Sequence, residues 1–124
     1  MPPLRVLYVE DHADVRELVV MLLEEEGLAV VACASAEAAQ DAFAAGAFDV
    51  LMTDVSLPTL PGTELATRLQ HGRADLWVVF CSGYSMQPGL QAWGPRARAL
   101  TKPFEADELH SLMAEIRASV DPAA

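Results

Sequence analysis

Reactive side chains follow four short apolar runs of this chain, each at the point where the run ends. They are two carboxylates at Glu10 and Asp11, a third at Asp54, a hydroxyl at Ser82 and an ammonium at Lys102. The runs themselves are Val6–Val9, Val50–Thr53, Leu76–Cys81 and Ala97–Thr101. Apolar runs of this length are typical of buried strands. If these strands lie in one parallel sheet, their carboxyl ends bring all five groups to one edge, where such sheets bind ligands.

Carboxylates gathered in this way would repel one another. Two unit negative charges about 5 Å apart, at an effective dielectric constant of about 20, repel by roughly 3 kcal/mol. The single ammonium of Lys102 offsets only part of the repulsion among Glu10, Asp11 and Asp54. We therefore expect the cluster to raise its own pKa values or to bind a hard cation. Mg²⁺ fits such a site, because it prefers oxygen ligands and retains several waters beside one or two carboxylates.

Each of these positions also has an ordinary structural explanation when it is taken alone. Glu10 and Asp11 suit a solvated turn that caps a helix, and Asp54 and Ser82 suit the ends of strands. Lys102 suits a surface loop before Pro103. Only the repeated placement at strand ends indicates a shared site.

Strand-like and helix-like segments alternate along the chain. The strand-like segments are 4–9, 28–33, 48–53, 76–81 and 97–101. Helical spacing predicts helices through 15–23, with Val15, Leu18, Val19, Leu22 and Leu23 on the apolar face, and at 36–45, 63–70 and 105–120. Met21, Met52 and Met113 are interpreted as core residues. This alternation predicts an α/β fold: a doubly wound, five-stranded parallel sheet with the strand order 2-1-3-4-5, as in flavodoxin.

The segment between Ser85 and Arg96 departs from this regular pattern. It contains Pro88, Gly89, Gly94 and Pro95, which break helices. We therefore expect a short or irregular fourth helix.

Composition and charge limit the class of protein. The 124 residues fit one domain over 1–124, with a core from about 4 to 119 and a frayed tail at 120–124. With 52% hydrophobic residues and a formal net charge of −10, the chain suits a globular protein and not a nucleic-acid-binding one. Its longest apolar run, Leu28 to Ala34, is far short of the roughly 18 residues of a membrane span. We expect a cytoplasmic protein, with Cys33 and Cys81 as buried, reduced thiols.

The placement of these groups resembles the receiver domain of two-component response regulators, over nearly the whole chain. The strongest resemblance is the stretch Asp54–Gly62, which has a hydrophobic residue, a proline and a glycine at the third, fourth and eighth places after Asp54. Glu10-Asp11, Ser82-Gly83 and Lys102-Pro103-Phe104 stand at the family's relative positions. The segment Ser82–Ser85 is similar to the corresponding segment of receivers associated with hybrid histidine kinases.

The resemblance implies a role for each residue of the cluster. Asp54 would accept a phosphoryl group from a phosphohistidine of a partner, a histidine kinase or a histidine phosphotransfer domain. Asp11 and Asp54 would bind Mg²⁺ together with the backbone carbonyl of Ser56, and Glu10 would act mainly through a bound water. Ser82 and Lys102 would hold phosphoryl oxygens.

The resemblance also implies roles for residues around the phosphoryl group. Ser56 and Tyr84 would flank it, and Lys102-Pro103 would be a cis peptide, a geometry found almost only before proline. Receivers usually carry an aromatic residue three positions before the lysine, where this chain has Ala99. The usual aromatic relay of the signal is therefore absent.

Several alternatives to a working phosphoacceptor remain open from the sequence. A degenerate receiver would act only as a protein-interaction module, although the retained Asp54, Asp11, Ser82 and Lys102 argue against it. A nucleotide or flavin site lacks the glycine-rich loop that should follow the first strand. A hydrolase lacks an evident histidine base beside Ser82. As a receiver, the chain would catalyse its own phosphorylation and slow dephosphorylation without being a conventional enzyme. We expect no nucleic-acid or membrane partner, and a weak homodimer remains open.

Overall fold

A single parallel sheet organises the chain, and its strand order is β2-β1-β3-β4-β5. The computed structural model describes residues 3–85 and 87–120. Every neighbouring pair of strands is parallel, so the predicted fold class and strand order are confirmed. The strands are β1 Arg5–Val9, β2 Ala29–Cys33, β3 Val50–Asp54, β4 Trp77–Ser82 and β5 Ala97–Thr101.

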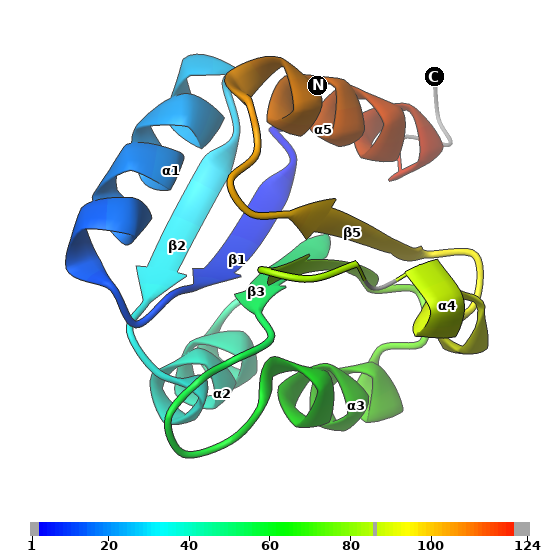
Figure 1. Ribbon diagram of the computed structural model, residues 1–124. Coiled ribbons are helices and arrows are strands. Elements are labelled where there is room, and N and C mark those ends of the chain that lie inside the picture. The colour runs from blue at the N-terminus through cyan, green and yellow to red at the C-terminus, as the bar shows by residue number, and fades with distance from the viewer. Residues whose placement is uncertain (1–2, 86, 121–124) are drawn as a thin grey trace.

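Helices cover both faces of this sheet (Figure 1). One face carries α1, Ala13–Glu25, and α5, Ala106–Val120, and the other carries α2, Ala36–Ala45, and α3, Gly62–Gly72. No helix within residues 3–85 and 87–120 is long and apolar enough to cross a membrane. Of the predicted frayed tail, Val120 is the last residue of α5, and 121–124 lie outside the described residues.

Two apolar cores lie on the two faces of the sheet, because successive side chains of a strand point to opposite sides. On β1, Val6 and Tyr8 pack toward α1 and α5, whereas Leu7 and Val9 pack toward α2 and α3. All four are 0–1% exposed. Burial on both faces explains why the central strands are continuous apolar runs instead of alternating ones.

The first helix buries a narrower stripe than its sequence pattern predicted. Val19 and Leu23 are buried, but Val15, Leu18 and Met21 are 38%, 56% and 58% exposed. The helix predicted through 15–23 is present, but the prediction of Met21 as a core residue was wrong. α1 lies over β1 and β2 at the edge of the sheet, so its outer flank has no strand or helix to pack against (Figure 1).

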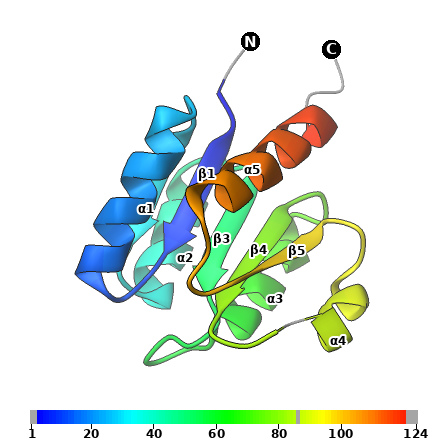
Figure 2. The same cartoon turned by 45° about the horizontal axis from the view of Figure 1, so that its top comes forward.

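The fourth helix is short, as the prolines and glycines predicted. α4 spans only Gln87–Leu90, and a 3₁₀ turn, η1, follows at Gln91–Trp93 (Figure 2). The ring of Trp93 packs edge-on against Phe80, with the ring centroids 4.9 Å apart. Phe80 pairs with Ala99 across β4 and β5, so the two side chains share a face of the sheet. Trp93 thus packs against a residue of the sheet, Phe80, that lies next to Ala99.

Gly62 allows the start of α3 to approach the end of β3 closely. A Cβ at this position would lie 2.1 Å from the backbone oxygen of Asp54, a distance that no side chain can occupy. The amide of Gly62 also donates to the carbonyl of Val55 at 2.9 Å. The loop from Asp54 to Gly62 therefore depends on the absence of a side chain at Gly62.

We predict that Gly62→Ala destabilises the fold by about 1–3 kcal/mol, because the new methyl group overlaps backbone that has no room to move. Urea unfolding followed by circular dichroism measures this free energy. Gly72→Ala, at the other end of the same helix, is the matched control, since a Cβ there meets nothing within 4 Å. Equal stability of the two variants would contradict the prediction.

Candidate functional site

The carboxylates predicted to meet do lie together, at the carboxyl-terminal edge of the sheet. Glu10 and Asp11 follow β1, and Asp54 ends the neighbouring strand β3. One ligand atom from each of Glu10, Asp11, His12 and Asp54 can be chosen so that all four lie within 4.8 Å of one another. The register of β1 and β3, which pairs Val9 with Thr53, sets this proximity.

Lys102 reaches this cluster from the end of β5. Its Nζ lies 2.8 Å from Oε1 of Glu10 and 3.2 Å from Oδ2 of Asp54. The side chain of Glu10 is fully buried and that of Asp54 is 8% exposed, so the carboxylates of both ion pairs lie away from water. Since β4 separates β5 from β3, the long side chain of lysine is needed to span this distance.

The pKa values of the cluster follow from burial and from the position of Lys102. Burial raises the pKa of Asp54, and attraction to Lys102 offsets only part of that effect. Burial also acts to raise the pKa of Glu10, but hydrogen bonds with Lys102 and His12 outweigh it, and the pKa falls below its ordinary value. Burial acts to lower the pKa of Lys102, yet Glu10 and Asp54 together raise it. The pKa of Asp54 is thus raised, but mainly by burial and only in lesser part by the predicted repulsion from Glu10, and the pKa of Glu10 is lowered instead of raised.

Asp11 has an oxygen that fits a bound cation. Its Oδ1 is buried, and it is the one such side-chain atom without a hydrogen-bond partner in the part of the chain that the structure describes. A buried acceptor left without a partner costs free energy, and a metal ion is one way to satisfy it. With oxygen donors from Glu10, Asp11 and Asp54 together, the residues present fit a hard divalent cation such as Mg²⁺.

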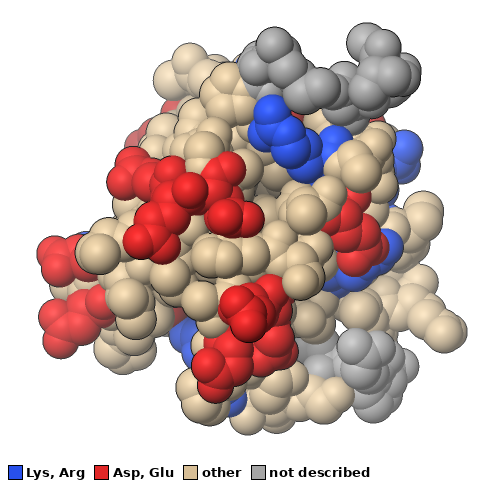
Figure 3. Space-filling model, turned by 90° about the horizontal axis from the view of Figure 1, so that it is seen from above, with Lys and Arg blue, Asp and Glu red and all other residues tan. Residues whose placement is uncertain are grey.

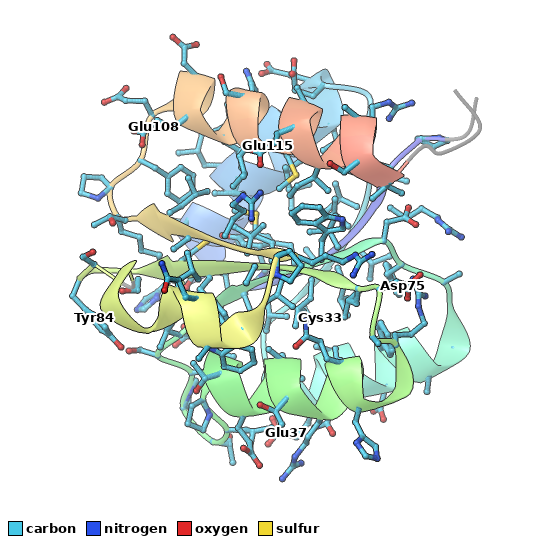
Figure 4. All side chains as sticks on the ribbon, turned by 90° about the vertical axis from the view of Figure 1, so that its right-hand side faces the viewer. Cys33, Glu37, Asp75, Tyr84, Glu108 and Glu115 are labelled. Carbon is cyan, nitrogen blue, oxygen red and sulfur yellow. The ribbon has the colours of Figure 1, made fainter. Side chains whose placement is uncertain are left out.

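Ser82 lies at the same edge, but its hydroxyl is turned to its own loop. It donates to the carbonyl of Tyr84 at 2.5 Å and accepts from the amide of Tyr84 at 3.0 Å. The side chain of Tyr84 is 59% exposed and lies at the opposite end of the sheet from Asp75 (Figure 4).

The remaining loop residues of the predicted site are Ser56, beside the carboxylate of Asp54, and Pro103, after Lys102. The amide of Ser56 donates to Oδ1 of Asp54 at 3.3 Å, and the side chain of Ser56 is exposed. The peptide between Lys102 and Pro103 is cis, as predicted. The amide of Lys102 donates to the carbonyl of Ser82 at 2.7 Å, which joins the ends of β4 and β5.

Two residues of the site were not identified from the sequence. Arg16, in the second turn of α1, donates from Nη1 to the carbonyl of Glu10 at 2.8 Å and so holds the loop that carries the carboxylates. The side chain of His12 is 72% exposed, but its Nδ1 also lies 3.1 Å from Oε2 of Glu10. The only sequence feature that could have indicated Arg16 and His12 is that both follow Glu10-Asp11 closely.

Comparison with known protein sequences identifies relatives of the chain. The family model for the response regulator receiver domain matches residues 6–114. The response regulator receiver protein CpdR of Brucella abortus is 33% identical over 109 residues, covering 85% of this chain and 89% of that protein. The chain spans about half the length of several transcriptional regulatory proteins that it also matches.

Solved structures agree with the sequence relatives. The response regulator TrrA of Thermotoga maritima, in complex with Mg²⁺ and BeF, superposes with a TM-score of 0.82 at 27% identity, covering 91% of this chain and 98% of TrrA. The receiver domain of the hybrid histidine kinase CckA gives a TM-score of 0.77 at 27% identity, covering 90% of this chain and 97% of that domain. Together with the match over 6–114, these likenesses show that the chain belongs to the response regulator receiver domain family of two-component signalling.

Proposed function

We propose that this chain accepts a phosphoryl group on Asp54 from a phosphohistidine of a histidine kinase or a histidine phosphotransfer domain. The observation that carries the proposal is the position of the Asp54 carboxylate. It lies in the cluster with Glu10 and Asp11, and its Oδ2 is 3.2 Å from the Nζ of Lys102. A nucleophile, a cation site and a fixed positive charge are the groups that phosphoryl transfer needs.

Asp54 would act as the nucleophile without a general base, because an ionised carboxylate has no proton to remove. One of its oxygens would bond to phosphorus as the phosphorus–nitrogen bond of the phosphohistidine breaks, and the electron pair of that bond returns to the imidazole. Lys102 would neutralise charge that spreads over the equatorial oxygens. When bound at Glu10, Asp11 and Asp54, Mg²⁺ supplies further positive charge to the same oxygens.

Phosphorylation would then favour a second arrangement of the loop after β4. A phosphoryl group adds nearly two negative charges and new acceptor oxygens. Ser82 would exchange its bonds to the backbone of Tyr84 for a bond to one of these oxygens, which moves the loop. Lys102, held by Glu10 at 2.8 Å, would shift its contacts toward the new charge. Ser56 and Tyr84 would flank the phosphoryl group, as the family resemblance implies.

The exposed flank of α1 supports a partner that docks beside Asp54. Val15, Leu18 and Met21 form an apolar surface on α1, which begins two residues after Asp11. Acidic side chains form broad patches on the face of the molecule seen in Figure 3. A partner with a complementary apolar and basic surface would bring its phosphohistidine to the edge of the sheet.

We predict that Asp54→Asn abolishes phosphorylation and leaves the fold intact. Intact mass spectrometry after incubation with a small phosphodonor and Mg²⁺ should find one added phosphoryl group on the wild type and none on the variant. Asp75→Asn, an exposed change before β4, is the matched control and should label like the wild type. An unlabelled wild type would favour the interaction module, and equal labelling of Asp54→Asn would place the acceptor elsewhere.

The order of metal affinities gives a second prediction. Asp11→Asn should weaken Mg²⁺ binding about tenfold or more, and by more than Glu10→Gln does. Oδ1 of Asp11 has no hydrogen-bond partner, whereas Lys102 and His12 already contact the two oxygens of Glu10. Isothermal titration calorimetry measures both affinities, and the reverse order would refute the assignment of Asp11 as a direct ligand.

The raised pKa of Asp54 gives a third prediction, for the metal-free protein. The pKa of the Asp54 carboxyl is higher in the folded state than in the unfolded chain, so ionisation is easier when the chain is unfolded. The folded protein therefore loses stability as pH rises through that pKa. Asp54→Asn should therefore be more stable than the wild type at pH 7 in a chelator, with a gap that narrows on acidification. Urea unfolding at several pH values measures the gap, and a gap that widens on acidification would contradict this.

A further inference from the structure

His12 lies among the carboxylates of the site, although the wider residue pattern gave it no role. Its Nδ1 is 3.1 Å from Oε2 of Glu10 and 3.4 Å from Oδ1 of Asp11. With Asp54, these residues form the group whose ligand atoms lie within 4.8 Å of one another. The cluster thus offers one nitrogen donor beside its oxygens.

The distances from His12 match those between two ligands of one metal ion. At metal–ligand distances of about 2.1 Å, neighbouring ligands lie about 3.0 Å apart around an octahedral ion and about 3.4 Å apart around a tetrahedral one. The ring of His12 therefore needs little movement to share an ion with Glu10 and Asp11.

The carboxylate oxygens near the ring of His12 are ones that Lys102 does not contact. Lys102 contacts Oε1 of Glu10 and Oδ2 of Asp54, so Oε2 of Glu10 remains on the side of His12. Oδ1 of Asp11 is buried and has no hydrogen-bond partner. The backbone amide of His12 already donates to Oε2 of Glu10 at 3.2 Å, so the ring is not needed to satisfy that oxygen.

We propose that His12 is an additional metal ligand, which makes this a mixed nitrogen and oxygen site with a preference for first-row transition dications such as Zn²⁺ and Co²⁺. Imidazole suits these ions, whereas Mg²⁺ selects oxygen. The proposal deepens the proposed function, since it concerns the ion at the same site. It predicts that the site binds Zn²⁺ more tightly with the ring of His12 than with the carboxylates alone.

The test compares His12→Gln with His71→Gln in the full chain. His12 is 72% exposed and His71 is an exposed residue near the end of α3, so both variants should fold. Zn²⁺ and Mg²⁺ affinities are measured by calorimetry, and Co²⁺ is followed by its visible absorption. We expect His12→Gln to lower Zn²⁺ affinity about tenfold or more and to change the Co²⁺ spectrum. His71→Gln should match the wild type, and Mg²⁺ affinity should stay within about twofold in both variants.

Three results would overturn the proposal. Unchanged Zn²⁺ affinity in His12→Gln would mean that the ring is no ligand. An equal loss of Zn²⁺ and Mg²⁺ affinity would mean that His12 acts only by positioning Glu10. An equal loss of Zn²⁺ affinity in His71→Gln would mean that Zn²⁺ binds to exposed histidines in general and not at this site. Because these measurements use no phosphodonor, and labelling of Asp54 uses Mg²⁺ alone, the proposed function and the role of His12 can fail separately.

Discussion

The contact between Lys102 and the two buried carboxylates is the interaction on which the site depends. Glu10 is fully buried, and a buried carboxylate without a cationic partner is strongly destabilising. Lys102 provides that partner only if β5 ends at the same edge of the sheet as β1 and β3. Three features support that placement. They are the parallel strand order, the hydrogen bond from the amide of Lys102 to the carbonyl of Ser82, and the close approach of α3 to β3 at Gly62.

The fold could be predicted because its signals are local and repeated. Strands that are continuous apolar runs must be covered by helices on both faces of the sheet. Right-handed crossovers then restrict the order of the strands. The meeting of Glu10, Asp54 and Lys102 follows from that order alone. Periodicity could not tell which flank of α1 is covered, because that depends on where the sheet ends. The direction of the pKa shift of Glu10 depends on which oxygens Lys102 and His12 reach, and this geometry of loops and rotamers has no signal in residue spacing.

The region around β5 has a fixed part and a less constrained part, which bears on how a signal would leave the site. Arg98 pairs with Glu115 of α5 at 2.6 Å and stacks over the ring of Trp77 at 5.1 Å. These contacts tie β5 to α5 and β4. By contrast, the described residues between Ser82 and β5 include, as regular elements, only the four-residue helix α4 and the 3₁₀ turn η1, and the ring of Trp93 packs on Phe80. Under the proposed function, a change at Ser82 would pass into this segment more readily than into α5.

The two sides of the carboxylate cluster differ in what can be exchanged. On the inner side, Lys102 is 27% exposed and joins a fully buried Glu10, so its removal would leave charge in the core. On the outer side, the side chain of His12 is 72% exposed, and its ring contacts Glu10 from the solvent side of the cluster. The inner contact therefore supports the fold, and under the proposed function the outer side is where a cation and a phosphoryl group would bind. If Asp54 accepts a phosphoryl group as proposed, this asymmetry would let the ligands of the site change while the sheet that positions Asp54 stays in place.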